Sequence, residues 1–225
     1  MEIQRIILIV DDSKNIDRDI KSYSTIFEKL KEARNLDYNL IFHTRKKYEE
    51  AIELLQDPDI VFDVVIVDHN LSEGGNEHSG DELIQEIRQH INKHCKLIFY
   101  SMGDLAEIFP NRLDLINLFN LGIFRFLSKD MSTSSTTLFG SGQMQLRVET
   151  IIDAIQDIDF VQVTLERYFA EYREVISDEM ITVAGKNYSV NEIINLIKKD
   201  ADEGRLYKSN LAESVIIHNI LTGGK

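Results

Sequence analysis

The sequence predicts an α/β fold: a five-stranded parallel, doubly wound sheet followed by a mainly helical C-terminal extension. The sheet is predicted by five short apolar runs in the first 130 residues, each followed by a helical pattern of apolar side chains. Such alternation is typical of parallel strands joined by helices that cover both faces. The extension is predicted by the apolar spacing after residue 143, which is almost entirely helical.

The predicted strands span residues 5–10, 39–44, 61–67, 96–101 and 123–128. The segment after the first strand shows helical periodicity through Ile16, Ile20, Tyr23, Phe27 and Leu30. The later strands are followed by the same kind of pattern. Because ligands bind at the carboxyl ends of parallel strands, the residues that follow each run are the first candidates for a site.

The extension begins after a stretch rich in Ser, Thr and Gly at 131–143, which predicts a loop. Residues 143–176 read either as one long helix or as two helices broken near 156–159. A hairpin is predicted around the turn-like "AGKN", a capping box of Ser189 and Glu192 starts a helix, and a last helix covers 206–221. We therefore predict two domains, a sheet domain at 1–157 and a helical interaction region at 158–225.

Composition narrows the class of protein. The net charge of −13 disfavours nonspecific binding to nucleic acid or to an acidic membrane surface. A single cysteine, Cys95, cannot form an internal disulfide and fits a reducing compartment. The apolar run in the first ten residues is too short for a signal peptide or a membrane span. We expect a cytoplasmic protein.

Acidic and polar side chains follow the predicted strands. They are Asp11 and Asp12 after the first strand, Asp68 after the third, Ser101 at the end of the fourth, and Ser128 and Lys129 after the fifth. These strand ends share one edge of a parallel sheet, so three acids, a hydroxyl and an ammonium converge there. Three carboxylates repel one another unless a hard cation lies among them, and Mg²⁺ prefers such oxygen ligands. A carboxylate beside Mg²⁺ and an ammonium is placed to attack a phosphoryl group.

At this point the chain resembles the receiver domains of bacterial two-component response regulators. The resemblance lies in "IILIVDDS", "VVIVDHNL", "LIFYS", "LGIFRFLSK" and "SGDELIQEIR", which occur in the family's order on the corresponding elements. It covers roughly residues 4–157. It implies a flavodoxin-like fold, a phosphorelay role, and phosphate transfer from a sensor histidine kinase or a phosphotransfer protein.

The resemblance also implies a magnesium site. Asp12 and Asp68 would bind the cation, Asp11 would act directly or through water, and the backbone carbonyl of Asn70 would complete the protein's ligands.

Phosphoryl transfer to Asp68 is the chemistry that the resemblance implies. Lys129 would pair with the phosphoryl oxygens and Ser101 would move to donate a hydrogen bond to them. Phe126 falls on the family's aromatic switch position and would swing inward.

Two departures affect the loops around this site. Asp130 stands where a proline normally follows the lysine, and Ser72 stands where a proline is usual after Leu71. The loop after Ser72 and the loop before the fifth helix are also unusually long. All residues needed for phosphoryl transfer are still present. The departures leave open the rate of transfer, the surface that contacts the partner and the lifetime of the phosphorylated state.

We expect a response regulator without enzymatic output that signals by binding an unknown downstream protein. Residues 144–225 hold nine Lys and Arg against fourteen Asp and Glu, whereas a DNA-binding output needs a basic surface. Two alternatives remain. One is an adaptor that uses a receiver scaffold independently of phosphorylation. The other is a transcriptional regulator with a cryptic DNA-binding C-terminus.

Several individual residues have a plainer reading beside the functional one. Asp11 and Asp12 could cap the first helix, and His69 could be an ordinary loop histidine. His90 and His94, next to Cys95, have the spacing of a helical metal pair, but histidines at a helix C-terminus also suit its dipole.

The apolar positions of 144–176 predict a homodimer or partner seam, or else the core of a C-terminal domain. They are Ile151, Ile155, Leu165, Tyr168, Phe169 and Tyr172.

Overall fold

The computed structural model describes residues 3–71, 78–102, 105–128, 136–137 and 140–222. The chain divides into two compact units. The first unit comprises the residues up to 57 together with 62–88 and 95–158, and the second comprises 58–61, 89–94 and 159–225. The predicted domains, 1–157 and 158–225, meet one residue before the junction between these units. Each unit is described by itself.

The first unit contains the predicted parallel sheet. Its strands are β1 (Ile3–Val10), β2 (Tyr38–Arg45), β3 (Val64–Asp68), β4 (Lys96–Ser101) and β5 (Ile123–Ser128). They pair in parallel in the order β2-β1-β3-β4-β5, which is the flavodoxin-like order. The predicted fold class is therefore confirmed. The strand order reverses direction between β1 and β3, and a ligand site is expected outside their carboxyl ends.

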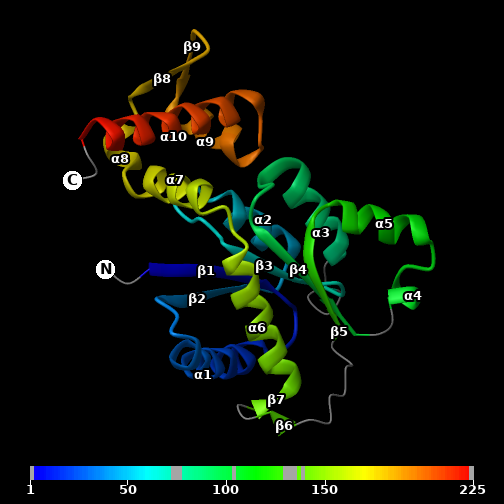
Figure 1. Ribbon diagram of the computed structural model, residues 1–225. Coiled ribbons are helices and arrows are strands. Elements are labelled where there is room, and N and C mark those ends of the chain that lie inside the picture. The colour runs from blue at the N-terminus through cyan, green and yellow to red at the C-terminus, as the bar shows by residue number, and fades with distance from the viewer. Residues whose placement is uncertain (1–2, 72–77, 103–104, 129–135, 138–139, 223–225) are drawn as a thin grey trace. The chain divides into compact units, whose positions relative to one another are not determined.

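Helices cover both faces of this sheet (Figure 1). The helices of the first unit are α1 (Ile16–Arg34), α2 (Tyr48–Gln56), α3 (Gly80–Glu86), a π-helix (Ile87–Ile91), α4 (Leu105–Ile108), α5 (Arg112–Asn120) and α6 (Gly142–Gln156). Two short strands, β6 (Thr136–Thr137) and β7 (Gly140–Ser141), pair before α6. In the part of the chain that the structure describes, no helix is long and apolar enough to cross a membrane.

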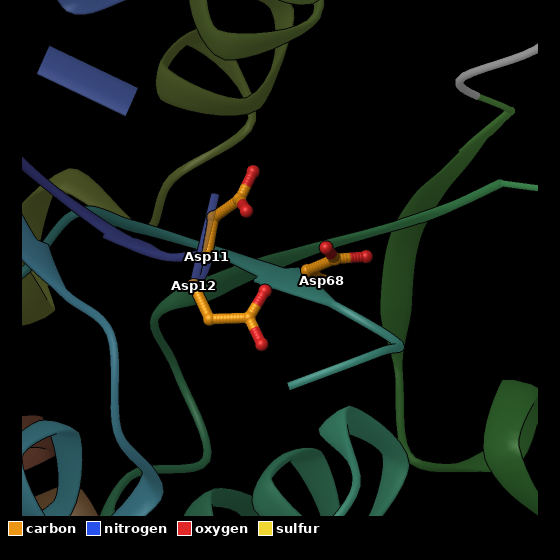
Figure 2. A group of neighbouring side chains, drawn as sticks. All are labelled: Asp11, Asp12 and Asp68. Carbon is orange, nitrogen blue, oxygen red and sulfur yellow. The ribbon is translucent and has the colours of Figure 1, made fainter. Parts of the chain in front are cut away.

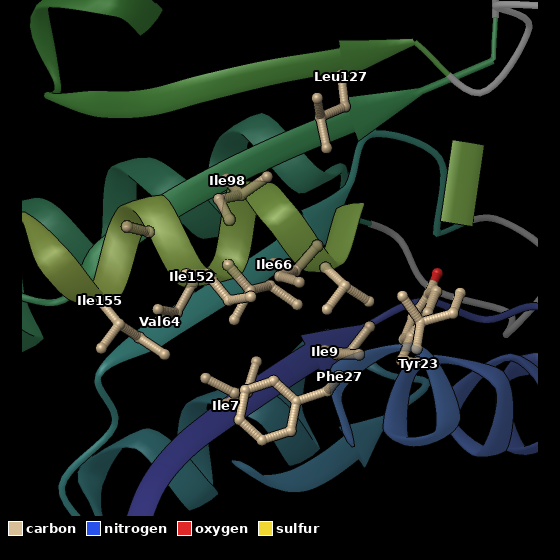
Figure 3. Close-up of a cluster of buried hydrophobic side chains, with 14 of the residues drawn as sticks. Ile7, Ile9, Tyr23, Phe27, Val64, Ile66, Ile98, Leu127, Ile152 and Ile155 are labelled. Atoms are coloured by element: carbon tan, nitrogen blue, oxygen red, sulfur yellow. The ribbon is translucent and has the colours of Figure 1, made fainter. Parts of the chain in front are cut away.

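One part of the core of the first unit lies between the sheet and the helices α1 and α6 (Figure 3). Side chains of β1, β3 and β4 that point to this face pack against Tyr23 and Phe27 of α1 and against Ile152 and Ile155 of α6. Each fully buried aliphatic or aromatic side chain stabilises the fold by about 1.5–3 kcal/mol. This packing holds the carboxyl edge of the sheet in place.

The third strand begins three residues later than the apolar run predicts. The Asp63 carboxylate accepts a hydrogen bond from the Ile6 amide (2.7 Å) and pairs with the Arg5 guanidinium (3.2 Å). Asp63 is fully buried, so these partners offset the cost of burying its charge. The Asp63 backbone also bonds to both neighbouring strands, from its amide to the Ile6 carbonyl and from the Lys96 amide to its carbonyl (both 2.9 Å), and β3 starts at the next residue, Val64.

The second unit is mainly helical. Its elements are α7 (Phe160–Glu171), α8 (Arg173–Ile176), β8 (Met180–Val183), β9 (Lys186–Ser189), α9 (Val190–Lys198) and α10 (Asp202–Thr222). The predicted hairpin is present, with Ala184 and Gly185 at positive φ in its turn. The predicted capping box of Ser189 and Glu192 is also present. Its core joins apolar side chains of α7, the hairpin and α9.

The apolar residues of 144–176 do not form one seam. Ile151 and Ile155 are buried in the first core, and Leu165 and Phe169 are buried in the second. The helical pattern breaks between α6 and α7, where the Asp159 carboxylate caps α7 by accepting from the Gln162 amide (3.1 Å). Four of the six residues of the predicted seam therefore serve as internal core, whereas Tyr168 and Tyr172 are exposed. Association through this segment stays a prediction.

Candidate metal centre

Three aspartates lie together at the carboxyl edge of the sheet (Figure 2). Asp11 and Asp12 directly follow β1, and Asp68 is the last residue of the neighbouring strand β3. One carboxylate oxygen from each lies within 4.8 Å of the others, and all three residues are buried, with 4%, 9% and 4% of their surface exposed. Such a cluster repels itself unless positive charge compensates it. The arrangement is compatible with a divalent cation.

Asp68 is held in place by the chain that follows it. The His69 amide donates to the Tyr100 carbonyl (2.9 Å), and the Asn70 amide donates weakly to the Asp68 carboxylate (3.4 Å). The first residue of α3, Gly80, packs directly against this turn. A Cβ added to Gly80 would lie 2.0 Å from the Asp68 carbonyl oxygen, so only glycine fits at this position.

Asp11 has partners on both carboxylate oxygens. Oδ1 accepts a hydrogen bond from the Ser13 amide (2.8 Å), and Oδ2 accepts one from the Tyr100 hydroxyl. Burial raises the pKa of the Tyr100 phenol well above its usual 10, and the neighbouring Asp11 raises it further. The phenol is therefore protonated at neutral pH and acts as a donor. Asp11 is oriented by two donors rather than by solvent.

A cavity of about 340 Å³ opens over the aspartates. It is lined by Asp11, Asp12, Ser13, Asp68, His69, Asn70, Ser101 and Met102. These residues come from the ends of β1, β3 and β4, so the cavity lies at the point where the strand order reverses. It combines carboxylate, amide and hydroxyl oxygens, which suit a hard cation that retains some of its water.

The structure brings most of the predicted site residues together. Asp11, Asp12, Asp68, Asn70 and Ser101 all line the cavity. The Ser101 hydroxyl is buried and donates to the Met102 carbonyl (3.1 Å). Their chemical roles stay predictions.

Two further predictions concern the strand β5. Lys129 lies outside the described residues, as do Ser72 and Asp130. The last residue of β5, Ser128, pairs in register with Ser101, the last residue of β4. Phe126 is partly buried, with its ring centroid 5.7 Å from that of Phe99.

His69 lies beside the phosphoacceptor candidate and packs between aromatic rings. Its ring centroid is 5.8 Å from that of Phe99 and 5.6 Å from that of Phe109. Burial lowers the pKa of His69, although the nearby Asp81, at 3.7 Å, opposes this effect. A neutral imidazole therefore forms one wall of the cavity.

The histidine pair beside Cys95 has other partners. His94 Nε2 lies 3.1 Å from the Ile197 carbonyl, and the Cys95 sulfur accepts from the Arg88 guanidinium (3.6 Å). Among the described residues, the acidic group around Asp68 is the one cluster of three or more candidate metal ligands.

Sequence reasoning missed two contributors to the site, Tyr100 and Gly80. Tyr100 directly precedes Ser101 in "LIFYS", and strand alternation places the two side chains on opposite faces. Its position in the apolar run suggests a core residue rather than a partner of Asp11. Gly80 precedes a helical pattern, but no local signal shows that it must approach Asp68.

The first unit has the flavodoxin-like fold that receiver domains share. No family model and no curated protein matches the chain. Among solved structures, a response regulator receiver domain protein from Clostridium thermocellum is similar, with a TM-score of 0.46, 20% identity, and 68% of this chain and 94% of that chain covered. A response regulator receiver protein from Pseudomonas putida has a TM-score of 0.38 and 22% identity over 57% of this chain and 88% of that chain.

Proposed function

We propose that the protein is a two-component response regulator that accepts a phosphoryl group on Asp68 in a Mg²⁺-dependent reaction. The observation that carries this proposal is the convergence of Asp11, Asp12 and Asp68, whose ligand oxygens lie within 4.8 Å of one another. Burying three carboxylates at one point costs stability in the absence of a cation. Because the cluster does not stabilise the fold, its presence is better explained by a function such as cation binding.

The cation would be held by oxygen ligands of the first unit. Asp12 and Asp68 would bind it directly, with the Asn70 carbonyl as a third ligand. Because both oxygens of Asp11 already accept hydrogen bonds, a water-mediated contact suits Asp11 better than a direct one. Bound Mg²⁺ would supply positive charge that stabilises the phosphoryl oxygens during transfer.

The donor would be a phosphorylated histidine of a sensor kinase or a phosphotransfer protein. An oxygen of the Asp68 carboxylate attacks phosphorus and forms a P–O bond, while the P–N bond to the donor imidazole breaks and that imidazole takes up a proton. The Ser101 hydroxyl then turns from the Met102 carbonyl to a phosphoryl oxygen. Lys129 forms an ion pair with a second phosphoryl oxygen, and the Phe126 side chain moves inward.

The second unit would be the output region, acting by protein binding rather than by catalysis. From Ala212 to Leu221 every residue of α10 is exposed. Five of them are large and apolar: Val215, Ile216, Ile217, Ile220 and Leu221. Exposed apolar side chains gathered on one helix favour a docked partner. The acidic balance of 144–225 disfavours nucleic acid as that partner.

Intact-mass measurement after incubation with acetyl phosphate and Mg²⁺ tests the proposal. We expect the wild type to gain one phosphoryl group, and Asp68→Asn to gain none. Asp114→Asn, which changes an exposed aspartate of α5, is the matched control and keeps full uptake. Equal uptake by the wild type and Asp68→Asn contradicts the assignment, as does a wild type that takes up nothing.

A further inference from the structure

The residue before Ser101 connects the acidic site to two helices. Tyr100 lies in β4 and is almost completely buried. Its hydroxyl donates to Asp11 Oδ2, while the Arg147 guanidinium of α6 lies 5.1 Å from the centroid of its ring. Arg147 in turn donates to the Tyr23 hydroxyl of α1 (2.7 Å). Tyr100 therefore has a carboxylate of the site at its hydroxyl and a cation over its face.

Each of these contacts acts on the orientation of Asp11. The Asp11 side chain is fixed at Oδ1 by the Ser13 amide and at Oδ2 by Tyr100, so it cannot rotate without losing a hydrogen bond. A guanidinium over the face of a phenol ring is attracted to that ring, so Arg147 helps to hold the Tyr100 ring, and with it the hydroxyl that donates to Asp11, in place. Arg147 is held over the ring by its bond to Tyr23, so the brace includes α1 as well as α6.

We infer that Tyr100 is a positioning residue for the cation site, that Arg147 braces it, and that cation binding is thereby coupled to α6. This inference rests on the proposed Mg²⁺ site and extends it. Groups that orient metal-binding carboxylates contribute to affinity without touching the metal, and their loss typically costs about 10- to 100-fold in affinity. Coupling is reciprocal, so a cation that depends on the Arg147 brace must also stabilise the helix that carries it.

Calorimetric titration with MgCl₂ tests the positioning role. Tyr100→Phe keeps the ring and its burial but removes the donor, and we expect about tenfold weaker Mg²⁺ binding. Tyr38→Phe is the matched control. It is also a buried tyrosine, but it pairs with Ile3 at the opposite end of the sheet, and its hydroxyl has no hydrogen-bond partner among the described residues. This control should bind Mg²⁺ within about twofold of the wild type, since no contact with the site is lost.

Arg147→Met tests the brace with a second variant, because methionine keeps much of the apolar stem and removes the guanidinium. Loss of a cation–π contact of about 0.5–1 kcal/mol corresponds to roughly two- to fivefold weaker Mg²⁺ binding. Amide hydrogen exchange gives a readout that a purely structural residue would not change. Mg²⁺ should slow exchange in α6 of the wild type and of Tyr38→Phe, and should slow it much less in Tyr100→Phe and Arg147→Met.

The outcomes separate this inference from the proposed function. A wild type that binds no Mg²⁺ overturns both. A wild type that binds Mg²⁺ while Tyr100→Phe binds it within twofold overturns only the positioning role. Mg²⁺ binding that leaves exchange in α6 of the wild type unchanged overturns the coupling to this helix.

Discussion

The two units depart from the usual distribution of side chains in opposite ways. The first unit buries three carboxylates at the edge of its sheet, whereas the second unit exposes five large apolar side chains along the last turns of α10. Charged groups are rarely buried without partners, and apolar groups rarely gather on a free surface. The buried carboxylates lower the stability of the first unit when no cation compensates them, whereas the exposed apolar side chains favour association of the second unit with a partner.

These opposite departures favour different ligands for the two units. A cluster of buried oxygen atoms is suited to a small, hard cation and to the phosphoryl chemistry that the cation supports. An apolar helical surface is suited to another protein. The first unit therefore carries the proposed input of the protein and the second its proposed output.

The largest expected effect comes from adding a methyl group at a tightly packed glycine, once in each unit. Gly80→Ala places a methyl group 2.0 Å from the Asp68 carbonyl oxygen, and Gly204→Ala in α10 places one 2.5 Å from the Leu196 carbonyl. We expect Gly80→Ala to lower the free energy of unfolding of the first unit by about 3 kcal/mol, and Gly204→Ala to lower that of the second by somewhat less. Hydrogen exchange resolved along the chain in urea measures both.

Gly185→Ala is the control for these variants, because its added methyl group meets no atom within 4 Å and only its positive φ of 79° is unfavourable. It should cost about 1 kcal/mol. If Gly80→Ala loosens the second unit as much as the first, the two units do not unfold independently and the comparison fails.

The next effect compares one buried acid in each unit. Asp12→Asn removes a charge from the cluster, so we expect the Mg²⁺-free protein to gain about 1 kcal/mol of stability and to lose its stabilisation by Mg²⁺. Glu166→Leu should lose about 1–2 kcal/mol instead, because it removes the carboxylate that accepts a hydrogen bond from the buried side-chain amide of Gln162 (2.5 Å). Urea denaturation with and without MgCl₂ measures both changes. A destabilised Asp12→Asn protein would mean that the cluster serves folding rather than binding.

A smaller effect on stability is expected on the exposed surface of α10. Ile216→Glu combined with Ile220→Glu should change the free energy of unfolding by no more than about 0.5 kcal/mol, because both side chains are largely exposed. The same variant should bind less of a hydrophobic dye and lose retention of partner proteins. Val175→Glu changes an exposed apolar residue of α8 and should leave both readouts near the wild type. A large loss of stability would show that this part of α10 belongs to a core.

The smallest expected effect is a dependence of the stability of the second unit on pH. Burial lowers the pKa of His94 below its ordinary 6.5, although its hydrogen bond to the Ile197 carbonyl opposes this. The unfolded chain therefore binds a proton more readily than the folded one. The contribution of neutral His94 to the free energy of unfolding is complete above pH 6.5. It declines as the pH falls from 6.5 through the lower pKa of the folded state, and the decline corresponds to the uptake of at most one proton. His94→Gln should flatten this decline in thermal unfolding scans, and an unchanged slope would show that His94 does not cause it.

The strands, the hairpin, the capping box of Ser189 and Glu192, and the acids Asp11, Asp12 and Asp68 at the strand ends could all be predicted from the sequence. These features depend on short-range patterns: apolar periodicity, turn residues, and the rule that parallel strands share a carboxyl edge. Most of the candidate site could be predicted for this reason, since its residues directly follow predicted strands.

Long-range packing selects which distant residues complete the site and where the apolar faces of 144–176 are buried. The bond from Tyr100 to Asp11 spans 89 positions and the bond from Arg147 to Tyr23 spans 124, while Gly80 meets Asp68 only because α3 packs against the end of β3. Ile151 and Leu165 lie in different cores because the helix breaks between α6 and α7. The sequence around the break does not show which core each helix joins. Local periodicity shows that a side chain is buried, but its partner is selected by the packing of elements that are far apart in the sequence.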